Sequence, residues 1–279
     1  MSEALAGLPA AWAEPAPLIR APHGWRRLVT LTSRMGTFAL VELQKLRHDR
    51  TELVTRAIQP VLWMVIFGTT FARLHAFPTD VPYLDFLAPG IIAQSALFIA
   101  IFYGIQIIWD RDAGILNKLL VTPTPRAAFI TGKTFAAGIR SIAQVVVVVV
   151  VSLLMGVAMT MNPLKLLGAA LVVMLGAAFF ACLSMSIAGI VQARDRLMGI
   201  GQAITMPLFF ASNALYPIDL MPGWLQVVSR INPLSYEVDG LRGLLIGTSS
   251  HLALDFAVLA GAAVVGIAVA SGLLGRLVR

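Results

Sequence analysis

Five stretches of the chain run for about twenty residues or more without a charged side chain. They are Phe86–Trp109, Ser141–Leu164, Leu166–Ala193, Leu197–Ile218 and Phe256–Gly275, and a sixth, shorter stretch is Ala57–Ala72. About 20 apolar residues, at a rise of about 1.5 Å each, cross a hydrocarbon core of about 30 Å. The pattern therefore predicts an all-α polytopic membrane protein with six transmembrane helices. We expect these spans at about residues 53–74, 86–109, 135–161, 164–193, 197–217 and 252–275, within one transmembrane domain over 53–279.

Two segments precede the first span. Residues 1–24 are rich in Ala and Pro and lack both a basic start and a long apolar core, so we expect a disordered tail without a signal peptide. Residues 25–52 are predicted to form an amphipathic helix, because apolar residues recur at helical spacing, as at Leu28, Leu31 and Met35. Basic side chains flank this stripe. Such a helix serves as an anchor in the membrane interface or as a docking strip for a cytoplasmic partner, and both interpretations stay open.

The largest connection between spans, residues 110–133, contains a short predicted helix. Asp110 and Asp112 are expected at its start, since acidic side chains suit the positive N-terminal end of a helix. The helix is expected to run to Leu120. The sequence Thr122-Pro123-Thr124-Pro125 ends it, because a residue before proline is disfavoured in the α conformation.

The segment between the fifth and sixth spans is neither loop-like nor able to cross a membrane. We predict two short helices there, Pro222–Ser229 and Pro233–Ile246, which dip into the membrane from the external side. Asn232 followed by Pro233 is typical of an N-cap with proline at the first helical position. Met206-Pro207 is expected to break the fifth span.

The basic residues indicate the orientation. If both termini and the connections near 110–140 and 194–196 share one side, that side holds 17 of the 21 Lys and Arg residues. Positive residues concentrate on the cytoplasmic side of membrane proteins, so both termini are predicted to lie on the cytoplasmic side of the cytoplasmic (inner) membrane. The net charge of +7 is then explained by topology and by attraction to anionic lipids, without nucleic acid as a partner.

The motifs of enzymes and of ion-driven carriers are missing. Gly132-Lys133-Thr134 is not a phosphate-binding loop, since Ala127 stands where that motif needs its first glycine. The four histidines are scattered and Cys182 is the single cysteine, so we expect neither a metal site nor a disulfide. The spans carry no carboxylate in their interiors, whereas ion-coupled carriers keep ionisable groups there. Energy for any transport must therefore come from a partner.

Three stretches of the chain resemble a known family. They are ELQKLRHDRTELVTRAIQPVLWMVIFG from Glu42, the pair APGIIAQSALF and WDRDAGILNKLLVTPTPRAAFITGK, and LYPIDLMPGWLQVVSRINPLSYEVDGLRGLL near the C-terminus. From about Val41 onward the chain is similar to the permease subunit of an ATP-binding-cassette exporter of the type-2 family, which includes the daunorubicin-resistance-like permeases. The family often has proline after the connecting helix, whereas Thr51 follows Arg50 here.

The resemblance implies a partner and the residues that contact it. Residues 25–52 would be the family's connecting helix, and the loop after the second span its coupling helix, which rests on a separate cytoplasmic ATPase. ATP and magnesium would be bound by that partner, and this chain would hold no cofactor and would not itself be an enzyme. The family works as a dimer, so a second permease half, identical or a sister chain, is also implied. Carried onto this sequence, the contact residues are Asp110, Arg111, Asp112, Gly114, Leu116, Leu119, Leu120, Thr122 and Pro123 in the loop, with Glu42, Lys45, Arg47 and Arg50 in the connecting helix.

The resemblance also implies a substrate path, lined mainly by the second and fifth spans of the two permease halves. The candidate path residues are Phe98, Phe102, Gln106, Phe209, Phe210 and Asn213. For any single phenylalanine, core packing or lipid contact is favoured over a role in the path. Candidate residues at the external gate are Tyr216, Pro217, Asn232 and Pro233.

The function expected from these observations is export of an amphiphilic drug, antibiotic or lipid across the cytoplasmic membrane. Export of a polysaccharide or glycolipid is the first alternative, because exporters of these compounds share the fold. A membrane-embedded lipid-modifying enzyme is the second, and it would have to use Asp219, Glu237, Asp239 and His251. An ion-driven carrier is disfavoured by its need for carboxylates within the spans.

Overall fold

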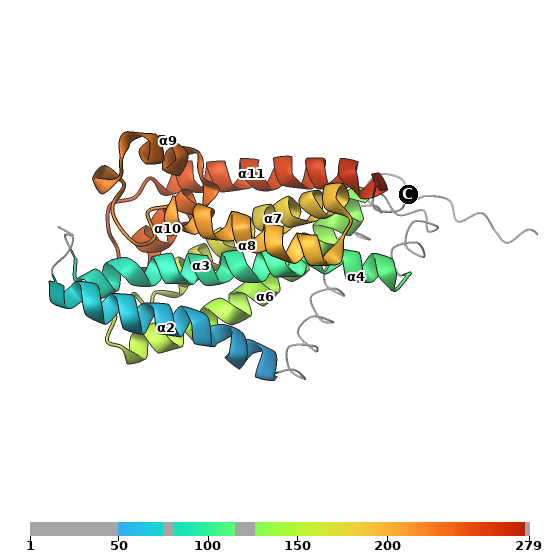
Figure 1. Ribbon diagram of the computed structural model, residues 1–279. Helices are drawn as coiled ribbons and strands as arrows, with labels where there is room; N and C mark the ends of the chain where they lie inside the picture. Colours follow the sequence, from blue (N-terminus) through green and yellow to red (C-terminus); the bar gives the residue numbers. More distant parts are fainter. Residues whose placement is uncertain (1–49, 75–80, 115–125, 277–279) are drawn as a thin grey trace, which may run out of the picture.

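The structure is a computed structural model, and it describes residues 50–74, 81–114 and 126–276 (Figure 1). Within these residues all regular structure is helical. The elements are α2 (Arg50–Leu74), α3 (Tyr83–Ile105), α4 (Ile107–Asp112), α6 (Arg126–Leu154), α7 (Pro163–Val191), α8 (Arg194–Phe210), η3 (Ile218–Leu220), α9 (Gly223–Ile231), α10 (Pro233–Leu245), α11 (Leu252–Leu273) and η4 (Leu274–Arg276). The predicted all-α class is confirmed for this part of the chain. The predicted tail and connecting helix lie outside it, except for the last residues before the first span.

Helix α3 is the centre of the bundle. It packs against α7, α6, α2, α10 and α8, and every residue from Asp85 to Leu97 is buried. A helix that is apolar on all sides has no preferred solvent face, so it is stable when other helices surround it. The other long helices bury one side and expose large apolar side chains on the other, such as Ile66 on α2 and Val264 on α11.

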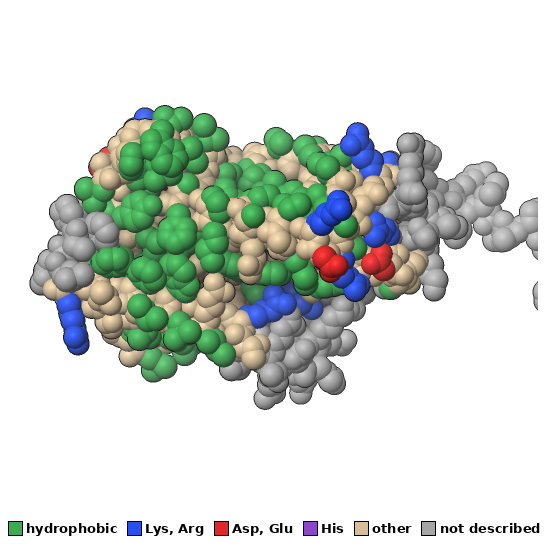
Figure 2. Space-filling model, viewed as in Figure 1, with side chains coloured by type: hydrophobic (Ala, Val, Ile, Leu, Met, Phe, Trp, Pro, Cys, Tyr) green, Lys and Arg blue, Asp and Glu red, His purple; other side chains and the backbone are tan. Residues whose placement is uncertain are grey.

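The surface pattern matches a protein surrounded by lipid. Figure 2 shows hydrophobic side chains over the middle of the visible face, with charged side chains gathered near one end, by α4 and the start of α8. Four helical stretches are long and apolar enough to cross a membrane: Tyr83–Asp112, Arg126–Leu154, Pro163–Val191 and Leu252–Arg276. The other two expected spans correspond to α2, which begins with charged residues, and to α8, whose 17 residues reach only about 26 Å.

Two helices end earlier than the expected spans. Helix α6 runs from Arg126 to Leu154 and not from 135 to 161, since Gly156 with a φ of 89° follows its C-terminus. Helix α8 ends at Phe210 and not at 217. Pro207 lies inside α8, so the helix continues for about one turn past the proline instead of breaking there.

The segment between α8 and α11 forms two short helices, close to the expected bounds. Helices α9 and α10 lie at the end of the bundle opposite α4 (Figure 1). Asn232 precedes α10, and its Oδ1 accepts a hydrogen bond from the Leu234 backbone N–H at 3.1 Å, with Pro233 at the first helical position. The expected cap is therefore present. Helix α10 packs against α7, α11 and α3, so it is held within the bundle and not on its surface.

Candidate functional site

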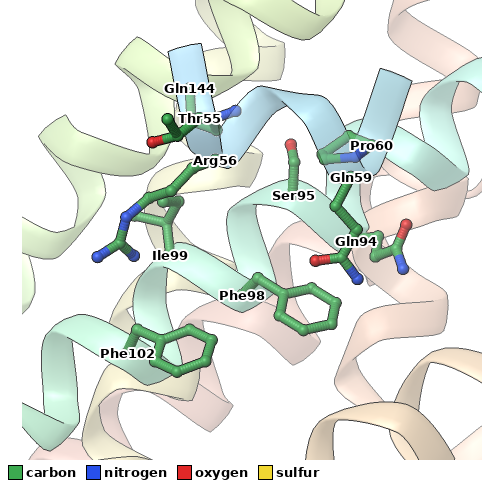
Figure 3. Close-up of a pocket in the computed structure, with 10 residues that line it drawn as sticks. All are labelled: Thr55, Arg56, Gln59, Pro60, Gln94, Ser95, Phe98, Ile99, Phe102 and Gln144. Carbon is green, nitrogen blue, oxygen red and sulfur yellow. The ribbon is translucent and has the colours of Figure 1, made fainter. Parts of the chain in front are cut away.

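A cavity of about 250 Å³ lies between α2, α3 and α6 (Figure 3). Helix α2 has Pro60 inside it, and α3 has Pro89. The cavity opens beside the exposed side chains of α2 and reaches inward to buried side chains of α3 and α6. Its lining residues are Thr55, Arg56, Gln59 and Pro60 from α2, Gln94, Ser95, Phe98, Ile99 and Phe102 from α3, and Gln144 from α6.

One part of the lining is aromatic. Phe98 and Phe102 are four residues apart on α3, so their side chains lie on the same face of the helix. Their rings are stacked, with centroids 6.4 Å apart and an angle of 17° between the planes. The guanidinium carbon of Arg56 lies 5.8 Å from the centroid of the Phe102 ring, within the range of a cation–π contact.

The other part of the lining is made of side-chain amides. Gln94 and Gln144 are each 1% exposed, and none of their four amide atoms has a hydrogen-bond partner among the described residues. Leaving a buried polar group unpaired costs about 1–3 kcal/mol, so such groups usually bind a ligand or water. Amides do not titrate near neutral pH and are poor nucleophiles. The two amides can donate and accept hydrogen bonds, so they suit the binding of a polar group.

The candidate path residues fall into separate places. Phe98 and Phe102 line this cavity, whereas Gln106 lies at the junction of α3 and α4. On α8, Phe209 is fully buried and packs edge-on against Trp63 of α2 at 5.6 Å between ring centroids. Phe210 is 41% exposed and borders a second cavity, of about 550 Å³, between α8 and α9. Phe98 and Phe102 thus line a different cavity from Phe210.

The remaining candidates lie in the turn after α8 or at the start of α10. The Tyr216 hydroxyl donates to the Phe210 carbonyl oxygen at 2.7 Å, and Pro217 directly precedes η3. Asn213 donates from Nδ2 to Asp239 Oδ1 at 2.5 Å. The Asn213–Asp239 contact joins the turn after α8 to α10 in a small polar network.

Arg242 ties this network to α3. Its guanidinium donates to the carbonyl oxygens of Asn213 at 3.0 Å and Phe86 at 3.3 Å, and it lies 3.9 Å from the centroid of the Phe86 ring. Burial lowers the pKa of Arg242 to about 10, with Asp239 acting in the opposite direction, so Arg242 stays charged at neutral pH. Arg242 is a structural residue that sequence reasoning missed.

Glu237 is the most deeply buried carboxyl group of the described chain outside the four membrane-length stretches. It is 0% exposed, neither oxygen has a partner among the described residues, and its carboxylate lies against Gly176 of α7. Burial raises the pKa of Glu237 well above its ordinary value of 4.5. The sequence identified Glu237 only as a possible catalytic residue. Its burial inside the bundle was not evident, because it stands in a helix rich in polar residues.

The four residues required by an enzymatic alternative do not all converge, although Asp239 and His251 interact electrostatically. Residues two apart on a helix face different directions, and here Glu237 faces Gly176 while Asp239 accepts from Asn213. Asp219 is exposed on η3 and His251 is exposed before α11. Among the described residues, no group of three or more His, Cys, Asp or Glu side chains could hold a metal ion.

The opposite end of the bundle carries the predicted coupling residues. Asp110 lies in the first turn of α4 and Asp112 is the last residue of this helix, while the rest of the predicted helix, to Leu120, lies outside the described chain. The chain continues from α3 through a break at Gln106, and Gly114 with a φ of 70° follows α4 in the left-handed region that glycine favours. Arg50 begins α2. The other predicted contact residues lie outside the described chain: Leu116, Leu119, Leu120, Thr122, Pro123, Glu42, Lys45 and Arg47.

Ion pairs attach α4 to two neighbouring helices. Lys133 of α6 pairs with Asp110, and its amino group lies 5.1 Å from the centroid of the Tyr103 ring. Arg194, at the start of α8, lies 3.8 Å from Asp112 and 5.4 Å from the centroid of the Trp109 ring. A displacement of α4 would therefore pull on both α6 and α8 through these ion pairs.

Comparison with known families and proteins adds independent evidence. A family model described as "ABC-2 type transporter" matches residues 36–246. The chain is 33% identical over 209 residues to the ycf38 transport permease of Porphyra purpurea, a match that covers 74% of this chain and 71% of the relative. It is 24% identical over 203 residues to the daunorubicin resistance ABC transporter permease protein DrrB1 of Streptomyces coeruleorubidus, covering 73% and 71%. Nodulation protein J of Rhizobium leguminosarum bv. viciae is 26% identical over 220 residues, covering 78% and 84%.

Proposed function

The chain belongs to the ABC-2 type transporter family, and from this premise we propose that it is the permease subunit of an ATP-driven exporter. The observation that carries the proposal is the match to this family over residues 36–246, supported by relatives that are named as transport permeases. A separate ATP-binding-cassette subunit would bind ATP and magnesium and hydrolyse the ATP. The permease would be a multi-pass protein of the cytoplasmic membrane with six spans and both termini inside.

Coupling would enter the permease at α4. ATP binding would move the ATPase subunits against residues 110–123, and the ion pairs of Asp110 with Lys133 and of Asp112 with Arg194 would pass this movement to α6 and α8. Helices α6 and α8 would then change their tilt between two discrete arrangements, as in other transporters that alternate between two states. The connecting helix would form a second contact with the ATPase.

The substrate is proposed to be an amphiphilic drug, antibiotic or lipid. The cavity between α2, α3 and α6 supports this class, because it places stacked aromatic rings beside unpaired amides. Those amides equally suit the hydroxyl groups of a glycolipid or polysaccharide, which is the second candidate. The path residues on α8 would meet those of a second permease half, identical or a sister chain, and the residues around Tyr216 and Asn232 would form the external gate.

The proposal is tested by co-purification. The chain is co-expressed with the ABC ATPase encoded nearest to its gene, the complex is reconstituted in lipid nanodiscs, and ATP hydrolysis is measured with and without candidate amphiphiles. A stable complex whose hydrolysis is stimulated by an amphiphile is the expected result. A permease that binds no ATPase in any lipid, with the ATPase well folded, would overturn the proposal.

A further inference from the structure

We propose that the cavity between α2, α3 and α6 selects uncharged hydrogen-bonding groups of the transported molecule through the amides of Gln94 and Gln144, which line different parts of it. Phe98 and Phe102 would hold a flat apolar part of the same molecule. This inference rests on the proposed export function and narrows its substrate class. It assigns specificity to two residues, one on α3 and one on α6, that lie 50 positions apart in the sequence.

The two amides lack hydrogen-bond partners among the described residues, whereas buried hydroxyl groups of the same bundle have them. Ser141, Ser152 and Ser184 all donate to backbone carbonyl oxygens, of Ala96, Val148 and Ile101 respectively. Gln94 and Gln144 have longer side chains and more freedom to find such partners, and yet all four amide atoms are unpaired among the described residues. Both side chains line the cavity. Their polar atoms are thus available to a bound molecule.

A glutamine amide is fully bonded only by a group that both donates and accepts hydrogen bonds. Each amide offers two N–H donors and one carbonyl acceptor. A hydroxyl group or another amide donates and accepts, so it satisfies both atoms of a glutamine. A carboxylate only accepts and an ammonium group only donates, so each leaves part of the amide unbonded. Arg56, which also lines the cavity, disfavours a cation further.

The aromatic lining and the volume of the cavity indicate the apolar part and the size of the bound molecule. Figure 3 shows Gln59 and Gln94 on one side of the cavity, and Arg56 and Phe102 on the other. The rings of Phe98 and Phe102 present faces and edges on which a flat ring can stack. A volume of about 250 Å³ is near the lower end of ligand pockets, which are typically about 300–1,000 Å³. It would hold one ring system with its polar substituent, which can be part of a larger molecule.

The test compares three probes that share one ring system. They are 1-naphthaleneacetamide, which is neutral and hydrogen-bonding, 1-naphthaleneacetate, which is an anion, and 1-ethylnaphthalene, which has no polar group. Binding of the tritiated probes to the full chain in phosphatidylcholine nanodiscs is measured by scintillation proximity, with empty nanodiscs subtracted. The expected order has the acetamide binding most tightly. Tightest binding of the acetate would overturn the proposal in favour of an anion site at Arg56, and equal binding of all three would show that the amides select nothing.

Substitutions of the two glutamines show whether their amides bind the acetamide. Gln94→Met and Gln144→Met keep the length of the side chain and remove the amide, and at least one of them is expected to weaken acetamide binding about three- to tenfold, the loss of one or two hydrogen bonds. Binding of ethylnaphthalene should not weaken. The control is Gln202→Met, since Gln202 is exposed on α8 away from the cavity. An equal effect of the control, or none from either cavity variant, would overturn the assignment.

Failure of this inference is distinguishable from failure of the export proposal. Probe binding is measured on the permease without any ATPase, whereas the export proposal is tested by complex formation and stimulated hydrolysis. A complex that forms and responds to amphiphiles, together with unselective probe binding, would reject the amide site alone. The comparison of probes on the unmodified chain also needs no variant to fold.

Discussion

Asn232 and Leu208 link the end of one helix to the start of another. The Asn232 side chain donates from Nδ2 to the Leu208 carbonyl oxygen at 2.7 Å, while its Oδ1 accepts from the backbone N–H of Leu234. Leu208 lies in the last turn of α8, where carbonyl groups have no partner within the helix. One buried side chain therefore caps α8 at its C-terminus and α10 at its N-terminus.

Replacing Asn232 should cost more than replacing an ordinary cap. Asn232→Ala is expected to destabilise the protein by about 2 kcal/mol, since it removes an N-cap and a buried hydrogen bond. The matched control is Asn162→Ala: Asn162 caps α7 in the same way, with Pro163 after it, but is exposed. The control should lose about 1 kcal/mol or less. Thermal unfolding in nanodiscs measures both, and equal losses would show that the bond to Leu208 contributes nothing.

The ion pair of Lys133 with Asp110 should be needed for coupling more than for folding. Lys133→Asp is expected to keep ATPase binding but to reduce the stimulation of hydrolysis by substrate, because α4 would no longer hold α6. The reversed pair, Lys133→Asp with Asp110→Lys, should recover part of the stimulation. Asp195→Asn, at an exposed acidic residue in the first turn of α8, serves as the control. A reversed pair no better than the single variant would count against transmission through this contact.

The buried Glu237 should make stability depend on pH. Because its folded pKa is raised, the folded state holds a proton that the unfolded chain releases above pH 4.5 or so. Below that pH Glu237 is protonated in both states and costs no stability through its ionisation. As the pH rises toward the raised pKa of the folded state, the free energy of unfolding falls. Glu237→Gln removes this titration, so the variant should gain in Tm relative to the parent as the pH goes from 5 to 8. A difference in Tm that stays constant across this range would mean that Glu237 does not titrate in the folded protein.

Residue patterns predicted the local features of this fold well and its contacts poorly. The helical class, the two short helices α9 and α10, and the Asn232-Pro233 cap all follow from runs, capping residues and prolines that act within a few positions. Helix α4 begins at Ile107, earlier than the expected start at Asp110, because α3 and α4 continue one another past Gln106.

The cavity could not be read from the sequence. Gln94 and Gln144 interrupt runs that are apolar on every face, so no periodicity tells which side of α3 or α6 is turned inward. That both line one cavity depends on how α3 and α6 pack against each other. The burial of Glu237 could not be predicted from the sequence either, because it depends on the space beside Gly176 of α7. The one available signal was the presence of a long polar side chain within a span.

Gly176 and Glu237 should therefore behave as a coupled pair. A Cβ added at Gly176 would overlap the Glu237 carboxylate, so Gly176→Ala is expected to destabilise the protein by about 1–3 kcal/mol, even though alanine favours a helix. Gly261→Ala is the control, because Gly261 lies in α11 with nothing within 4 Å of an added Cβ, and it should be neutral or stabilising by up to about 1 kcal/mol. Combining Gly176→Ala with Glu237→Ala frees the space that the methyl group needs. The double variant should therefore be more stable than the sum of the single effects, by about 1 kcal/mol or more in a double-mutant cycle. Thermal unfolding of the four proteins at pH 6 measures the coupling, and strict additivity would show that the two residues do not touch in the folded protein.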